Sequence, residues 1–96
     1  MIVRFEWDSQ KENINLRKHG VSFREAQSVF LDDEALLIPD PDHSHDEDCF
    51  VLLGLSHRIR LLLVCHCYRE NDQIIRIFSA RKADREETRI YLSKRG

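Results

Sequence analysis

Apolar residues recur along the chain at helical and at strand spacings, and the change of spacing divides the sequence into elements. Residues 2–7 have strand composition and predict a short first strand. Asp8 or Ser9 offers an N-cap for the first helix. The pattern Ser-x-x-Glu occurs twice, at residues 9–12 and 22–25, and each copy matches a capping box that typically begins a helix. Gly20 lies between them, where a left-handed glycine can end the first helix. We therefore expect two short helices joined at Gly20.

The second half of the chain has the composition of a strand meander closed by a helix. Residues 39–48 hold both prolines and predict an irregular loop, and residues 84–94 predict a final helix. Apolar runs separated by short polar segments predict strands at residues 35–38, 49–55, 60–68 and 73–79. The order β-α-α-β-β-β-β-α indicates an α+β fold, in which an antiparallel sheet packs against two N-terminal helices and one C-terminal helix.

Length and composition favour one domain over residues 1–96 in a reducing compartment. A chain of 96 residues with 42% hydrophobic content suits a single core. No apolar run approaches the ~20 residues that span a bilayer, and the first eight residues carry charges where a signal peptide is apolar. The three cysteines lack C-x-x-C spacing, so we expect free, mostly buried thiols. The predicted location is cytoplasmic, with no membrane association.

Charge is distributed unevenly, although the net charge is only −2. Residues 32–48 hold eight acidic side chains and no lysine or arginine. Residues 76–96 hold seven lysines and arginines against three acids, a local excess of four positive charges. A chain of this kind can attract a polyanion to one region in spite of its acidic total.

The cations near the predicted strands suggest a surface for single-stranded RNA. Strand alternation places Arg76 and Phe78 on one face, and it places Arg60 and His66 on one face of the preceding strand. If these faces coincide, one side of the sheet gathers Arg60, His66, Arg76, Phe78, Arg81 and Lys82. Guanidinium groups would then contact phosphates while the ring stacks on a base. The alternative is a solvated face whose arginines pair with acids of the loop.

Three further side chains have both a functional and a structural interpretation. His19 has the right chemistry for proton transfer near neutral pH, but a cation is also favourable at a helix C-terminus. Trp7 is expected either in the core or beside a nucleic-acid base, and Tyr91 either packs at the core edge or reaches a phosphate.

His43 and His45 with their acidic neighbours suggest a metal, but ligands at i and i+2 of an extended loop point in opposite directions. We therefore predict no metal site.

A series of motifs over nearly the whole chain resembles the BrnT toxin family, in the same order and with similar spacing. The most specific are Trp7-Asp8, Lys18-His19-Gly20-Val21 and Ser79-Ala80-Arg81-Lys82-Ala83. The resemblance extends to further positions, which are Phe5-Glu6, Lys11, Asn15, Ser22-Phe23, Glu25-Ala26, Val29-Phe30, His43-Ser44, Glu47, Phe50, Gly54, Ser56, Ile77-Phe78 and residues 86–91.

This resemblance implies a bacterial type II toxin with a RelE-like fold, acting as a ribonuclease that stops translation. It also implies a BrnA-type ribbon-helix-helix antitoxin, which neutralises the toxin and represses their shared operon, so that DNA is reached only through the antitoxin. RelE-like nucleases use no metal or other cofactor. The ribose 2′-hydroxyl attacks the adjacent phosphate, and preorganised cations stabilise the charge that develops.

The resemblance and the residue chemistry together assign roles to particular side chains. The expected catalytic residues are Arg81, Lys82, Arg60 and His19, and the expected RNA-binding residues are Trp7, Arg76, Phe78 and Tyr91. His19 is the first candidate for proton transfer, followed by Lys82, Tyr91 and His66. Two alternatives stay open: a non-catalytic partner that modulates a DNA-binding antitoxin, and a small metal-dependent nuclease that uses His43 and His45.

Overall fold

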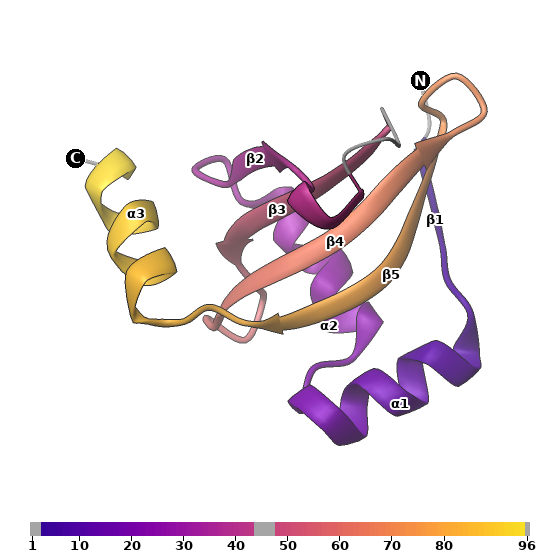
Figure 1. Cartoon of the computed structure of the whole chain (residues 1–96), viewed down its shortest axis with the longest axis horizontal. Helices are drawn as coiled ribbons and strands as arrows, with labels where there is room; N and C mark the ends of the chain where they lie inside the picture. The colour runs from indigo at the N-terminus through magenta and orange to yellow at the C-terminus, as the bar shows by residue number, and fades with distance from the viewer. Residues whose placement is uncertain (1–2, 44–47, 96) are drawn as a thin grey trace.

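The computed structural model describes residues 3–43 and 48–95, which form a five-stranded sheet with helices on both faces (Figure 1). The elements are β1 (Arg4–Glu6), α1 (Ser9–His19), α2 (Phe23–Ser28), β2 (Leu36–Pro39), β3 (Cys49–Leu55), β4 (Leu61–Arg69), β5 (Ile74–Lys82) and α3 (Arg85–Arg95). Short 3₁₀ turns follow α2 at Val29–Leu31 and follow β2 at Pro41–His43. The predicted order of helices and strands and the α+β class are confirmed.

The sheet is mixed, so the prediction of a purely antiparallel sheet is wrong at one edge. The strand order is β1-β5-β4-β3-β2, and only the β1–β5 pair is parallel. After β1 the chain passes through α1 and α2 to the far edge of the sheet and then returns strand by strand to β5. This long connection allows β1 to run parallel to β5, since two parallel strands cannot be joined by a tight hairpin. The neighbouring strands from β2 to β5 run antiparallel to one another.

Local signals place the helix ends close to where the sequence predicts them, but Asp8 and not Ser9 caps α1, and the Glu12 carboxylate accepts from the Phe23 and Arg24 amides at the start of α2 instead of completing a capping box. Asp8 caps α1 through Oδ1, which accepts a hydrogen bond from the Gln10 amide at 2.8 Å. Gly20 ends α1 with φ of 70°, a left-handed conformation that favours glycine, and its amide donates to the Leu16 carbonyl. Ser22 caps α2 by accepting from the Glu25 amide. The predicted helix junction at Gly20 is confirmed.

A β-bulge in β5 changes which side chains share a face. Cys65 is opposite Ser79 but His66 is opposite Ile77, so Phe78 is an additional residue with no counterpart on β4. Beyond the bulge the alternation of β5 is reversed, because one extra residue moves every later side chain to the other face. The sequence alternation therefore holds only up to Phe78.

The two faces of the sheet carry different sets of residues. The helix face, covered by α1 and α2, has the larger core, made of Val21, Phe23, Ala26, Val29, Leu52, Leu62, Val64, Ile75, Ile77 and Ala80. The α3 face has a smaller core, made of Val51, Leu53, Leu63 and Tyr91. Register places Lys82 beside Leu62 on the helix face, whereas Arg76 and Arg81 lie beside Cys67 and Leu63 on the α3 face. The expected gathering of all these cations with His66 on one side of the sheet is therefore wrong.

The expectation of three free thiols is also wrong. Cys49 and Cys67 are directly opposite in the β3–β4 ladder, with Cα atoms 4.1 Å apart, and they form a disulfide. Strand pairing creates this proximity across 18 residues of sequence, which the cysteine spacing alone does not reveal. Cys65 is free, and burial raises the pKa of its thiol to about 11, with a smaller contribution from Asp40.

Candidate nucleic-acid interface

Residues of α1 and β5 line a small surface groove of about 180 Å³, which we call the α1–β5 groove. Its lining residues are Lys11, Ile14, Asn15, Lys18, His19, Phe78 and Ser79. Lys11, Asn15 and Lys18 are spaced at i, i+4 and i+7, so they project from one face of α1. Phe78 enters the groove at the bulge. The groove therefore combines cations, an imidazole and an aromatic ring.

Asn15 holds the two walls of the groove together. Its amide nitrogen donates to the carbonyls of Val21 and Ala80, at 2.9 and 2.7 Å, and its amide oxygen accepts from the Ala80 N–H at 3.1 Å. The side chain is 7% exposed, so water does not compete with these bonds. α1 is consequently attached to β5 at a point two residues before Lys82.

Additional cations lie at the C-terminal end of the groove. Arg60 donates from Nη2 to the Gly20 carbonyl at 3.0 Å, which places its guanidinium at the end of α1. Lys82 pairs with Leu62 across the ladder and follows Ala80 on the strand that Asn15 binds, so it lies at the same end. Lys11, Lys18 and Lys82 have no ion-pair partner within residues 3–43 and 48–95. Their charges remain available to an anionic ligand.

Glu25 is the buried carboxylate beside this end of the groove. It is 2% exposed and makes a two-point ion pair with Nε and Nη2 of Arg60. Its Oε2 also accepts from the Ser56 hydroxyl at 2.6 Å, and Arg58 lies 3.8 Å from Oε1. The hydrogen bonds from Arg60 lower the pKa of Glu25 in spite of its burial, with Ser56 contributing in the same direction. The pair is therefore ionised.

The structure brings together four of the eight predicted site residues. His19 and Phe78 line the α1–β5 groove, and Arg60 and Lys82 lie at its C-terminal end. Trp7 lies apart, with its ring packed edge-on against Phe23 at a centroid distance of 6.2 Å. It is half-buried at the border of the larger core.

The remaining predicted site residues lie on the α3 face and already have protein partners. Arg81 forms a two-point ion pair with Glu87, at 2.9 and 2.8 Å, and Arg76 pairs with Glu6 at 3.0 Å. Tyr91 is 2% exposed, and its hydroxyl donates to Asp32 at 2.7 Å. These contacts favour structural roles for the three side chains.

His66, the reserve candidate for proton transfer, is fully buried on the helix face. Phe30 and Tyr68 pack edge-on against its imidazole at centroid distances of 4.8 and 5.3 Å. Burial lowers its pKa, although the nearby Val64 carbonyl acts in the opposite direction. An enclosed, neutral imidazole of this kind does not reach a substrate.

Sequence reasoning missed Lys11, Lys18 and Glu25 as site residues. The spacing of Lys11 and Lys18 on one helical face was a usable signal for the first two. The sequence places Glu25 in a capping box, but only one of the two hydrogen bonds of that motif forms, from the Glu25 amide to Ser22 Oγ. The Glu25 carboxylate binds Arg60 instead. Its partner is 35 residues away in the sequence, so no local pattern indicated the contact.

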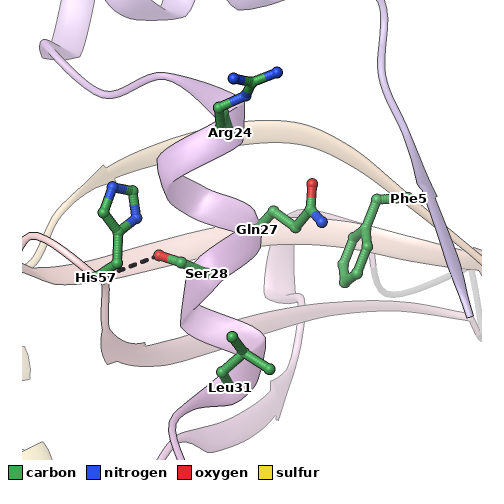
Figure 2. A pocket seen from close by; sticks show the side chains of 6 residues that line it. All are labelled: Phe5, Arg24, Gln27, Ser28, Leu31 and His57. Carbon is green, nitrogen blue, oxygen red and sulfur yellow. Dashed lines mark hydrogen bonds between the residues drawn. The ribbon is translucent and has the colours of Figure 1, made fainter.

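A larger surface pocket of about 410 Å³ lies elsewhere, along α2 (Figure 2). It is lined by Phe5, Arg24, Gln27, Ser28, Leu31 and His57. Figure 2 shows these side chains spread along the helix, with Arg24 and Leu31 at opposite ends. The one hydrogen bond drawn joins the His57 amide to Ser28 Oγ at 2.8 Å, and it attaches the β3–β4 turn to α2. The pocket is therefore a second surface depression, lined by one imidazole, His57, and one guanidinium, Arg24.

Two negative findings concern only the described part of the chain. No group of three or more histidine, cysteine, aspartate or glutamate side chains there is arranged to bind a metal ion. The hypothetical metal ligand His45 lies outside the described residues, as does the side chain of His43. Among the described helices, none has the length and apolar character required to cross a bilayer.

Comparison with known families identifies the group to which the chain is related. Residues 7–87 match the family described as the ribonuclease toxin BrnT of type II toxin–antitoxin systems. The chain belongs to the BrnT family. A comparison with curated protein sequences found no match. The crystal structure of the Brucella abortus ribonuclease toxin BrnT has the same fold, with a TM-score of 0.67 and 19% sequence identity over 86% of this chain and 99% of the other.

The range matched by the BrnT family includes the part of the chain that forms the groove. The matched range contains every lining residue of the α1–β5 groove as well as Glu25, Arg60 and Lys82, and it ends before Tyr91. The family describes toxins of type II toxin–antitoxin systems, so an antitoxin is the expected partner of a BrnT chain. The family resemblance inferred from the sequence is confirmed.

Proposed function

We propose that this BrnT chain is a metal-independent endoribonuclease that holds single-stranded RNA in the α1–β5 groove and inhibits translation by cutting it. The observation that carries the proposal is that Lys11 and Lys18 line the groove together with His19 and Phe78, while Lys82 lies at its C-terminal end. None of the three lysines has an ion-pair partner among the described residues. Unneutralised cations raise the local concentration of a polyanion, and an aromatic ring adds stacking that tolerates any base. The family description supports ribonuclease activity in general.

The reaction would proceed by attack of the ribose 2′-oxygen on the adjacent phosphorus. The bond from phosphorus to the 5′-oxygen of the next nucleotide breaks, giving a 2′,3′-cyclic phosphate and a free 5′-hydroxyl. One proton leaves the 2′-hydroxyl and one is supplied to the departing oxygen. His19 is half-buried in the groove, where an imidazole can carry out one of these transfers. Arg60 and Lys82 would stabilise the additional negative charge on the phosphorus centre.

Among the other predicted residues, this proposal gives a role in RNA binding only to Phe78. Phe78 would stack on a base within the groove. Arg81, Arg76, Trp7 and Tyr91 stay predictions, since each has a protein contact that explains its position without RNA. The antitoxin partner would be a BrnA-type ribbon-helix-helix protein, through which alone the toxin is associated with DNA, and the site of action would be the cytoplasm, where translation occurs.

The proposal is tested by incubating the purified protein with a labelled mixed-sequence RNA in EDTA. The parent should release fragments that end in 2′,3′-cyclic phosphate. Lys82→Ala should lower the cleavage rate by ~10²–10³, as for other preorganised donors. Lys94→Ala is the matched control, because it removes one exposed cation of α3 outside the groove. Its rate should equal the parent rate.

A further variant distinguishes the two faces of the sheet. Arg81 and Lys82 are adjacent in sequence, but their side chains project to opposite faces. Loss of cleavage in Lys82→Ala with little change in Arg81→Ala supports the groove, and the reverse result would assign the RNA to the α3 face. Intact RNA with the parent, both in solution and in a translation extract, would refute the nuclease and favour a toxin that acts only through protein binding.

A further inference from the structure

Glu25 occupies an unusual position for a charged side chain. It lies in the first turn of α2 and is 2% exposed, and burying a carboxylate is unfavourable unless other groups compensate its charge. Compensation comes from Nε and Nη2 of Arg60, from the Ser56 hydroxyl and from the more distant Arg58. The side chain therefore forms the centre of a network that joins α2 to the turn between β3 and β4.

The contacts of Arg60 leave one end of its guanidinium available. Of its five N–H donors, Nε and one on Nη2 bind Glu25, and the other on Nη2 binds the Gly20 carbonyl. The two N–H groups of Nη1 have no partner among the described residues. The side chain is 24% exposed, so solvent or a ligand can reach it. A two-point ion pair also defines the plane of the guanidinium, which a single contact would not do.

We propose that Glu25 is a positioning residue for RNA cleavage, holding the Arg60 guanidinium so that Nη1 faces a phosphate at the C-terminal end of the α1–β5 groove. The proposal rests on the nuclease function proposed above. Ser56 also holds Glu25, since its hydroxyl donates to Oε2, the oxygen that Nε of Arg60 binds, while its own oxygen accepts from the Arg60 amide. Both ends of Arg60, the backbone and the guanidinium, are thereby attached to one network.

Preorganisation is the physical reason why this network matters to the reaction. A free arginine side chain samples many rotamers, and ordering it at the moment of reaction requires free energy that lowers the rate. A guanidinium already held in place stabilises developing charge without reorganisation. Removing Glu25 should therefore slow the chemical step more than it weakens RNA binding, because Lys11 and Lys18 still attract the strand.

The alternative is that Glu25 only attaches the β3–β4 turn to α2. A double-mutant cycle distinguishes the two roles, with single-turnover cleavage and RNA affinity measured separately for the parent, Glu25→Gln, Arg60→Ala and the double variant. Glu25→Gln should cut ~10- to 100-fold more slowly with RNA affinity changed less than about threefold. In the Arg60→Ala background the same change should have no further effect on the rate. Glu86→Gln, in an exposed pair with Arg89, is the matched control.

A second, conservative variant keeps the proposal testable if Glu25→Gln does not fold. Arg60→Lys retains the positive charge but cannot make the two-point contact, and it should lose about tenfold in rate while keeping the parent circular dichroism spectrum. The inference is overturned if the parent cuts RNA while Glu25→Gln or Arg60→Lys cuts at the parent rate, or if the effects of Glu25→Gln and Arg60→Ala multiply. A parent that leaves RNA intact refutes the proposed function, and the inference with it.

Discussion

Reduction of the disulfide between Cys49 and Cys67 should destabilise the protein substantially. The bond joins directly opposite residues of β3 and β4, at the end of the hairpin away from the turn at residues 56–60. It closes a loop with a sequence separation of 18. Reduction therefore increases the conformational freedom of the unfolded chain, and it leaves the β3–β4 ladder held by hydrogen bonds and side-chain packing.

The expected size of the effect follows from the length of the closed loop. In the chain-entropy description, a loop of this length corresponds to about 3 kcal/mol in the free energy of unfolding. A domain of 96 residues has an unfolding entropy of roughly 0.2 kcal/mol/K at its midpoint. The thermal midpoint should therefore fall by about 15 °C on reduction.

Thermal unfolding followed by circular dichroism, with and without dithiothreitol, measures this shift. A Cys49→Ala, Cys67→Ala double variant should melt near the reduced parent and show no response to the reductant. Cys65→Ser is the control, because it retains the disulfide and should keep the full shift. Titration of thiols in the denatured, unreduced parent should find one free cysteine out of three. Three free thiols, or coincident melts of the oxidised and reduced parent, would show the reasoning to be wrong.

Two other side chains support stability predictions. Burial lowers the pKa of His66 below the ordinary histidine value of about 6.5, so the unfolded chain binds that proton more strongly, and the free energy of unfolding should fall as pH drops below about 6.5. Urea melts at pH 7.5 and 5.5 should show this fall, and a His66→Phe variant with an unchanged pH dependence would contradict it. Asn15→Ala leaves buried groups of Val21 and Ala80 without partners and should destabilise by about 3 kcal/mol, whereas exposed Asn13→Ala should stay within about 0.5 kcal/mol. Similar urea midpoints for both asparagine variants would refute the role of Asn15.

Much of the fold was predictable because its signals are local. The capping sequences and Gly20 act on adjacent backbone groups, and the apolar runs of β3 to β5 are bounded by short polar turns. β3 has the predicted bounds, Cys49–Leu55, and the last helix is displaced by only one residue at each end. Family motifs also indicated the BrnT assignment, since they extend over nearly all of the matched range.

The candidate site was predictable only in part, because it depends on contacts between distant segments. His19, Phe78, Arg60 and Lys82 were named from the sequence, but so were three residues that lie on the α3 face. A single additional residue in β5 places Lys82 on the helix face and Arg81 on the α3 face, and its position depends on how β5 aligns with β4. Strand register is determined by packing of whole faces, which no short sequence pattern encodes.

By itself the sequence determined the order of elements, the helix ends, the family and the residue types that could act on RNA. Tertiary structure decided which of those residues meet. It paired Cys49 with Cys67, turned the Glu25 carboxylate away from its own helix to Arg60, and assigned Lys82 and Arg81 to opposite faces. The difference lies in how far apart in the sequence the interacting groups are. Helix caps and turns depend on neighbouring backbone groups, whereas strand pairing and side-chain burial depend on segments that meet only when the core forms.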